Sequence, residues 1–421
     1  MTQTTAGKRG QSATSRFPAD FVWGAQSDPV FSEGETVSDW AGFAGPDGSV
    51  PDDGPRHWRR YRYDFRSLSN LGFNAYRFGL DWARLQRKPY APFSREERYR
   101  YLEMLAELRS LGIEPWLTLH HHALPRWAAS RGGWLNPELP RQFADYAARV
   151  ADLTDGEVVN WVTIHEPQFY AWSSRIWGLF PGSDWGRFGL AHKTLLHLRD
   201  AHRLAAAAVR RRLENARIGV SLPGGGYLPE RAWHPGDRLV ARLAGWLVNR
   251  ARIGPFLGGS DFLMIGMRVV HRLRAGNTLS LTTGLAPRFA HRVHEGGEAA
   301  EKNRDARRSV IRKWRSRFSG QIYLVGSTPP DAADDPGLPG TVRDCLALAS
   351  GETGRALGIA GFFYAPLLDQ FSPIRGLAGG SGLLEVDFRD PGRRREVRGF
   401  AKTLAEVIRR GSLTEEHDDG D

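Results

Sequence analysis

The stretch VVNWVTIHE, residues 158–166, has the pattern of a buried strand that ends in polar side chains. Apolar and small polar residues alternate up to Ile164, and the chain then presents His165 and Glu166 before a turn-forming Pro167. Seven other short apolar segments resemble it, and we predict a strand in each: 21–27, 74–82, 114–122, 216–222, 261–267, 321–327 and 359–367.

Longer segments with a helical pattern alternate with these strands. They lie at 57–71, 94–111, 137–152, 190–213, 237–251, 302–318, 341–357 and 396–410. Strands that alternate with helices pair in parallel through crossover connections, and eight such units indicate an α/β protein with a (β/α)8 TIM barrel. No linker or compositional break divides residues 16–412, so we expect one domain there. The polar residues 1–15 and the acidic tail 413–421 are predicted to be disordered.

Composition narrows the possible partners. The net charge of +11 comes mostly from arginine, in the clusters VRRRLENAR, RRSVIRKWRSR and GRRREVR. These clusters fall in helical patterns, so we interpret them as solvated helix faces and expect no nucleic-acid partner. No run of about 18 apolar residues predicts a membrane span, and no apolar leader precedes the barrel pattern. The single cysteine, Cys345, fits a reducing compartment, so we expect a cytoplasmic location. We also expect a small-molecule ligand and no cofactor.

Enzymes with this barrel place their chemistry where the strands run into the following loops. The side chains at those strand ends are the candidates for a site. They are Asp28, Arg77, Asp81, His120 to His122, His165, Glu166, Met267, Arg268, Ser327 and Asp369.

Several of these segments together resemble glycoside hydrolase family 1, the β-glucosidase-like retaining enzymes. The resemblance covers nearly the whole chain and rests on FPADFVWGA, YRYDFRSLSNLGFNAYRFGLDWARL, GIEPWLTLHHHALPRWAASRGGWLNPE, WVTIHEP, LLDQFSP and GLLEVDF, in that order. It implies a TIM barrel and a glycosidase-type site.

The resemblance also implies a role for single residues. Glu166 matches the acid/base glutamate, His121 matches a histidine that contacts the sugar, and Arg77 matches the arginine beside the nucleophile. His165 stands where the family has an asparagine, and Phe31 stands where it has a sugar-binding glutamine. A family tyrosine falls on Met267 or Arg268, and a sugar-binding glutamate with the following tryptophan falls on Ser372 and Pro373. Tyr364 and Asp369, at and after the last strand, complete the expected substrate-binding residues.

The nucleophile position departs most from the family. Where the family reads roughly Ile-Tyr-Ile-Thr-Glu-Asn-Gly, this chain reads IYLVGST, residues 322–328, which places Gly326 at the glutamate. A slip by one residue offers Val325 or Ser327, and neither is a carboxylate. Retaining hydrolysis needs two carboxyl groups about 5 Å apart, so we expect the retaining mechanism to be absent.

The loss of that anion changes what the pocket should bind. Arg77 then needs a counter-charge, either from Asp28, Asp81 or Asp369 or from an anionic ligand. Apolar residues at three positions that hold hydroxyl groups in the family favour a partly apolar ligand; they are Phe31, Met267 and Pro373.

Three hypotheses therefore stay open. The chain is an enzyme that acts on a glycoside-like molecule through Glu166, an inactive ligand-binding relative, or a proton-transfer or lyase-type enzyme whose anionic substrate is held by Arg77. A metal site from His121, His165 and Glu166 is conceivable, but we expect no metal, because the family uses none. Strand alternation predicts His120 and His122 on one side and His121 on the other.

Overall fold

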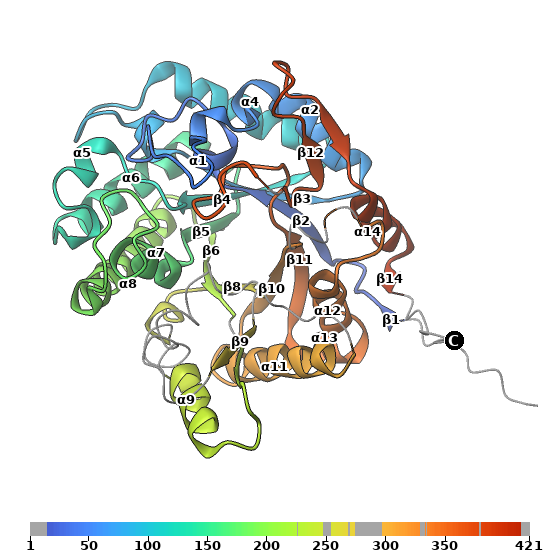
Figure 1. Ribbon diagram of the computed structural model, residues 1–421. Helices are drawn as coiled ribbons and strands as arrows, with labels where there is room; N and C mark the ends of the chain where they lie inside the picture. The colour runs from blue at the N-terminus through green and yellow to red at the C-terminus, as the bar shows by residue number, and fades with distance from the viewer. Residues whose placement is uncertain are drawn as a thin grey trace, which may run out of the picture.

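The structure is a computed structural model that describes residues 15–224, 226–246, 254–267, 270–273, 297–328, 333, 335–378 and 380–413. Eight parallel strands close a barrel in the order β10-β11-β2-β3-β4-β5-β6-β8 (Figure 1). They are β2 (Val22–Ser27), β3 (Ala75–Gly79), β4 (Glu114–His120), β5 (Asn160–His165), β6 (Arg217–Pro223), β8 (Phe262–Gly266), β10 (Gln321–Gly326) and β11 (Ile359–Tyr364). The predicted TIM barrel and its eight strands are confirmed, and β11 closes the barrel by pairing with β2.

Helices pack around the outside of the barrel (Figure 1). The longer ones are α2 (His57–Asn70), α4 (Arg95–Ser110), α6 (Leu139–Thr154), α7 (Pro167–Arg175), α8 (Phe188–Arg210), α9 (Pro235–Trp246), α11 (Gly297–Arg315), α12 (Gly340–Ala349), α13 (Gly351–Leu357) and α14 (Gly399–Arg410). The shorter ones are α1 (Pro29–Ser32), α3 (Trp82–Leu85) and α5 (Arg126–Ala129). The helix predicted at 341–357 is two helices, because Ser350 takes an extended backbone with ψ of 160° between them.

Three small sheets lie outside the barrel. β12 (Leu384–Val386) and β13 (Arg395–Val397) form an antiparallel pair, and the last two residues of β13 are the first two of the segment predicted as helix 396–410. The parallel pair β7 (Gly226–Pro229) and β9 (Val270–Leu273) follows β6 and β8. The pair β1 (Ser15–Arg16) and β14 (Ser412–Leu413) includes one residue of each terminal segment that we predict to be disordered, and the rest of those segments lies outside the described residues.

The barrel interior is filled by the side chains that point inward from the strands. Trp116 lies at its centre and makes edge-to-face contacts with Phe262, Tyr323 and Phe363, at ring-centroid distances of 5.0, 4.8 and 5.1 Å. Val325 belongs to the same inner cluster. Because successive side chains of a strand point to opposite faces, this cluster fixes which residue at each strand end points into the barrel.

The structure agrees in part with the interpretation of the arginine clusters as solvated helix faces. On α11, Ile311 and Trp314 are buried while Arg312 is exposed, as expected for a solvated face. Arg307, however, is buried and forms an ion pair with Asp344 of α12. Among the described residues, no helix combines the length and apolar character that crossing a membrane requires.

Candidate functional site

A cavity of about 270 Å³ opens at the end of the barrel where the strands run into the loops. Three of the residues predicted as substrate-binding line it, namely Phe31, His121 and His165. The rest of the lining is Gln26, Ser27, Asp28, His122, Phe169, Leu179, Phe180, Ser327, Ala365, Pro366, Gln370, Phe371, Ser372, Pro373, Ile374, Arg375 and Ser381. The cavity therefore combines aromatic walls with a polar group of histidines and one aspartate.

The histidine triplet does not follow simple alternation. β4 ends at His120, and His122 takes a left-handed backbone with φ of 64°, which turns its side chain to the same cavity as His121. His120 points away and accepts a hydrogen bond from Trp134 Nε1 at 3.3 Å. Burial lowers the pKa of His120 to about 3, so this ring stays neutral. The predicted pairing of His120 with His122 is therefore wrong.

Asp28 brings the two cavity histidines together. Its Oδ1 accepts a hydrogen bond from Val30 N at 3.1 Å and thereby caps α1. Its Oδ2 lies 3.1 Å from His122 Nδ1 and 3.4 Å from His121 Nε2. Burial raises the pKa of Asp28, and the hydrogen bond from His122 opposes that rise.

Glu166 lies at the edge of this group in an unusual backbone conformation. A register irregularity separates Val162 from His165 in the pairing of β5 with β6, and Glu166 then takes φ of 44° and ψ of 61°. Its side chain is buried, with 5% exposed, and its Oε1 lies 2.7 Å from the place that a Cβ on Gly266 would occupy. A non-glycine residue held in the left-handed region is strained, and such residues concentrate at functional sites. Glu166 nevertheless does not line the cavity.

Arg77 fixes the tautomer of the His165 ring. Arg77 is fully buried inside the barrel, and its Nη2 lies 2.7 Å from His165 Nδ1 while its Nη1 lies 3.1 Å from Met264 Sδ. A guanidinium can only donate hydrogen bonds, so His165 Nδ1 must accept, and the proton of the neutral ring is then on Nε2. His165 therefore carries a hydrogen-bond donor on Nε2, and Arg77 does not line the cavity.

The predicted counter-charges of Arg77 pair elsewhere. Asp81 Oδ2 lies 3.7 Å from Arg84 Nε, and Asp369 Oδ2 accepts a hydrogen bond from Arg398 Nη2 at 2.7 Å. The arginine that does line the cavity is Arg375. An anionic ligand in this cavity would therefore meet Arg375 rather than Arg77.

The end of β10 differs from the expectation at the nucleophile position. A Cβ on Gly326 would meet Phe362 Cε2 at 2.8 Å and Cys345 Sγ at 3.6 Å, which are groups between the barrel and its outer helices. Val325, one residue earlier, belongs to the inner cluster, so alternation directs position 326 outward. Ser327 lines the cavity. The residue of β10 that could face a substrate is thus Ser327, one of the two residues that a slip by one position offers.

Two further predicted residues, Tyr364 and Asp369, lie outside the cavity lining. The Tyr364 hydroxyl lies 2.7 Å from both Thr328 Oγ1 and the Ser381 carbonyl oxygen, and burial raises its pKa. Asp369 accepts hydrogen bonds from the backbone N–H groups of Gly382 and Val386 in addition to Arg398. Both therefore make hydrogen bonds that hold the fold together, and their predicted contact with a substrate stays a prediction. Arg268 lies outside the described residues.

Sequence reasoning overlooked most of the apolar wall. Phe31 packs on Phe371 at a centroid distance of 5.6 Å, and Phe169 packs on Phe180 at 5.8 Å. The first pair joins the loop after β2 to the loop after β11, while Phe169 lies on α7. Of these four rings only Phe31 carried a signal, because it stands at a polar position of the family; Pro373, which the sequence also indicated, lines the cavity as well. His122 could have been found only from its positive φ.

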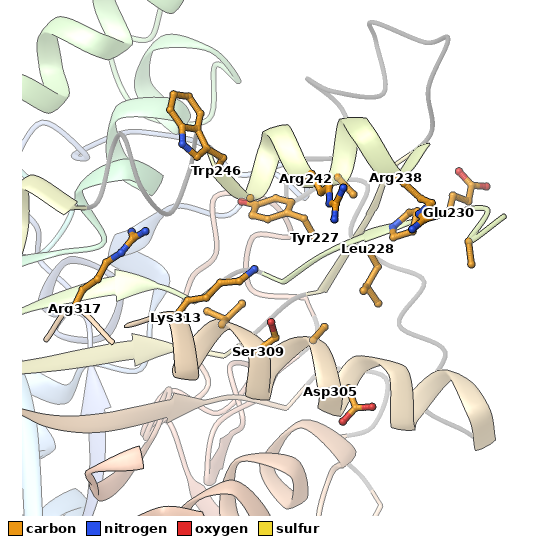
Figure 2. Close-up of a pocket in the computed structure, with 16 residues that line it drawn as sticks. Tyr227, Leu228, Glu230, Arg238, Arg242, Trp246, Asp305, Ser309, Lys313 and Arg317 are labelled. Atoms are coloured by element: carbon orange, nitrogen blue, oxygen red, sulfur yellow. The ribbon is translucent and has the colours of Figure 1, made fainter. Parts of the chain in front are cut away.

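A second hollow, of about 710 Å³, lies away from the barrel mouth, between α9, α11 and the sheet of β7 and β9. Figure 2 shows Lys313 of α11 opposite Tyr227, with Arg242 and Trp246 of α9 beside it. α9 ends at Trp246, and the next seven residues of the chain, 247–253, lie outside the described residues. Of the predicted site residues that the structure describes, none lines this hollow.

Comparisons with known proteins agree with this geometry. A family model described as glycosyl hydrolase family 1 matches residues 13–249. Similar sequences include β-glucosidase A of Thermotoga maritima, 27% identical over 51% of this chain and 50% of that protein, and thermostable β-glucosidase B of Thermobispora bispora, 30% identical over 58% and 51%. A 6-phospho-β-glucosidase of Bacillus subtilis is 27% identical over 58% and 55%. The chain thus spans about half the length of the curated relatives it matches.

The structural comparison extends over the whole barrel. The solved structure of a family 1 β-glucosidase from Thermotoga maritima superposes with a TM-score of 0.82, covering 95% of this chain and all of that one at 19% identity. The same enzyme in complex with glucoimidazole gives a TM-score of 0.81. At this identity the likeness shows the fold. Gly326 and Ser327 lie beyond the segment that the family model matches.

Proposed function

Because the chain belongs to glycosyl hydrolase family 1, we propose that it acts on a small glycoside-like molecule in the cavity at the end of the barrel. In this proposal Glu166 transfers the proton, and no covalent glycosyl-enzyme forms on β10. The observation that carries the proposal is the direction of the side-chain positions at the end of β10. Gly326 faces Phe362 and Cys345, and the side chain that faces the cavity is the Ser327 hydroxyl.

The cavity suits one ring-sized group that has both apolar and polar surface. Its volume of about 270 Å³ is near the lower end of ligand pockets, which span roughly 300–1,000 Å³. Phe31 and Phe371 offer flat apolar contact, and Asp28 and the His165 Nε2–H offer hydrogen bonds. Among the lining residues Asp28 is the one carboxylate, and it is already engaged by His122.

An anionic substituent on the ligand is supported by Arg375 in the lining and by the likeness to a 6-phospho-β-glucosidase. A paired assay separates the two substrate types. Aryl β-glucosides and their 6-phospho forms are compared on the wild type and on Arg375→Gln. We expect a preference for the phosphorylated substrate that Arg375→Gln removes; equal rates on both substrates would exclude the anionic ligand.

The mechanism is tested by trapping and by mutation. We expect a 2-fluoro glycoside inactivator to leave the intact mass unchanged, because β10 presents no carboxylate to the cavity. Glu166→Gln should lower turnover of aryl glycosides with poor leaving groups by about 10²–10⁴-fold, the usual range for loss of a general acid. Glu138→Gln, an exposed glutamate before α6, is the matched control and should keep full activity. An adduct on any β10 residue would refute the proposal.

A binding protein without turnover is the second candidate. It is favoured by one observation, namely that the Glu166 carboxylate is turned to Gly266 and does not line the cavity. Calorimetric binding of a glycoside with no turnover over days, equal in wild type and Glu166→Gln, would select this candidate over the enzyme.

A further inference from the structure

Three donor atoms of the cavity lie close enough together to share one metal ion. Asp28, His121 and His122 are all buried, and one ligand atom from each lies within 4.8 Å of the others. Asp28 Oδ2 is the common neighbour, 3.1 Å from His122 Nδ1 and 3.4 Å from His121 Nε2. In the described part of the chain this is the one group of three or more such residues that meets this distance.

The distance from Asp28 Oδ2 to His121 Nε2, 3.4 Å, matches tetrahedral coordination. Zinc ligands at bonds of about 2.0–2.1 Å and tetrahedral angles lie roughly 3.3–3.4 Å from one another. A hydrogen bond accounts for the 3.1 Å contact with His122, but 3.4 Å to His121 is longer than an ordinary N–H···O bond. Two imidazole nitrogens directed at a single carboxylate oxygen are better explained by an ion between all three.

The surrounding structure holds the donors in place. The second oxygen of Asp28 is anchored by Val30 N, which fixes the direction of Oδ2. The left-handed backbone of His122, with φ of 64°, is strained and is needed to bring this ring next to His121. Strain of this kind persists at sites that require a particular side-chain direction.

His165 is excluded as a ligand although its ring centroid lies 4.2 Å from that of His121. Arg77 occupies its Nδ1, so the ring proton sits on Nε2 and leaves that nitrogen without a lone pair for a metal. Such an Nε2–H can instead donate to a water or ligand on the ion. The metal-ligand set considered from the sequence, His121, His165 and Glu166, therefore gives way to the cluster of Asp28, His121 and His122.

We propose that Asp28, His121 and His122 bind a divalent transition-metal ion, with zinc as the best match, and leave a fourth position open toward the cavity. Three protein ligands with one open position are typical of reactive zinc sites. Two imidazoles and one carboxylate favour such ions over magnesium or calcium, which prefer oxygen ligands. The proposal goes beyond the proposed glycoside chemistry and does not depend on any turnover.

Direct metal binding tests this proposal. The chain, without an affinity tag and freed of metal by a chelator, is titrated with ZnCl₂ in a calorimeter and with CoCl₂ in a spectrophotometer. We expect one ion per chain and visible Co²⁺ absorption of a low-coordinate site, while MgCl₂ gives no signal. Asp28→Asn and His122→Gln should each weaken binding by at least about 100-fold, since even outer partners of metal ligands contribute 10–100-fold.

The matched control is another histidine–aspartate pair outside the cluster. His234 Nδ1 lies 3.2 Å from Asp237 Oδ1, and His234→Gln should leave the affinity unchanged. Absence of zinc binding, or an affinity that survives both cluster variants, overturns the proposal. If a cluster variant fails to fold, anomalous diffraction from zinc-soaked wild-type crystals decides. A peak between Asp28 Oδ2 and the two imidazoles supports the site, and a peak elsewhere or none refutes it.

Discussion

Replacing Gly326 with glutamate should destabilise the protein rather than restore a catalytic carboxylate. The family motif places a nucleophile here, so this substitution is the natural attempt at a repair. In the structure, however, the new side chain would point between the barrel and its outer helices. A Cβ would lie 2.8 Å from Phe362 Cε2, 3.0 Å from Phe362 Cζ and 3.6 Å from Cys345 Sγ.

The expected cost has two parts. The Cβ alone requires the Phe362 ring to shift, and overpacking of this kind costs about 1–3 kcal/mol, which Gly326→Ala measures separately. The carboxylate is then buried against Phe362 and Cys345, both fully buried. An unpaired buried charge belongs to the class of substitutions that cost more than about 4 kcal/mol. The sum is a large share of the roughly 5–15 kcal/mol that stabilises a typical domain.

Denaturant unfolding followed by far-UV circular dichroism measures these costs. Ser327→Glu is the matched control, because it adds the same side chain one residue later at the half-buried wall of the cavity. We expect it to cost about 1 kcal/mol or less, as for substitutions away from packed groups. The reasoning is refuted if Gly326→Glu is as stable as Ser327→Glu, or if Gly326→Glu, with or without added azide, gains activity on aryl glycosides.

Three further predictions concern residues around the barrel. Burial lowers the pKa of His202 to about 4, so its contribution to stability is complete above pH 6.5 and is lost as the pH falls toward 4; a shift of this size corresponds to about 3 kcal/mol. His202→Gln should flatten that part of the curve of unfolding free energy against pH, and an unchanged difference between pH 7 and pH 4 would contradict it. Arg395→Met removes the guanidinium that lies 2.8 Å from the fully buried Asp64 and leaves His57 Nδ1 as its neighbour at 2.8 Å; the change should cost about 3–5 kcal/mol in urea unfolding, and less than 1 kcal/mol would be inconsistent with this ion pair. Tyr364→Phe should cost about 1–3 kcal/mol while ligand affinity stays unchanged by calorimetry; a loss of affinity without a loss of stability would return Tyr364 to the binding site.

The fold could be predicted because it depends on repeated patterns. Each of the eight barrel strands is a short apolar run followed by a helical period, and small errors in the boundaries do not change the topology. The same regularity predicts the direction of the Tyr364 side chain. Phe363 belongs to the inner cluster, so the next side chain points outward.

The site was harder to predict because it depends on departures from those patterns. His122 reaches the cavity through a positive φ after the strand has ended, which the letters HHH do not reveal. Gly326 was assigned to the nucleophile position from a family motif, but it lies beyond the segment that the family model matches. A glycine has no side chain, so the direction of a side chain at this position follows only from the neighbouring atoms. The role of Arg77 depended on its distance to His165, a contact between strands 88 residues apart.

The pairing of β11 with β2 has a consequence for how the chain is made in the cell. During synthesis β2 is the first of the barrel strands to emerge, and one of its edges stays open until β11 leaves the ribosome about 340 residues later. At roughly 5–20 residues per second this delay is about 20–70 s. An open strand edge is a template for association with other chains. Newly made protein should therefore depend on chaperones during translation, and slowing the ribosome upstream of β11 should increase the aggregated fraction.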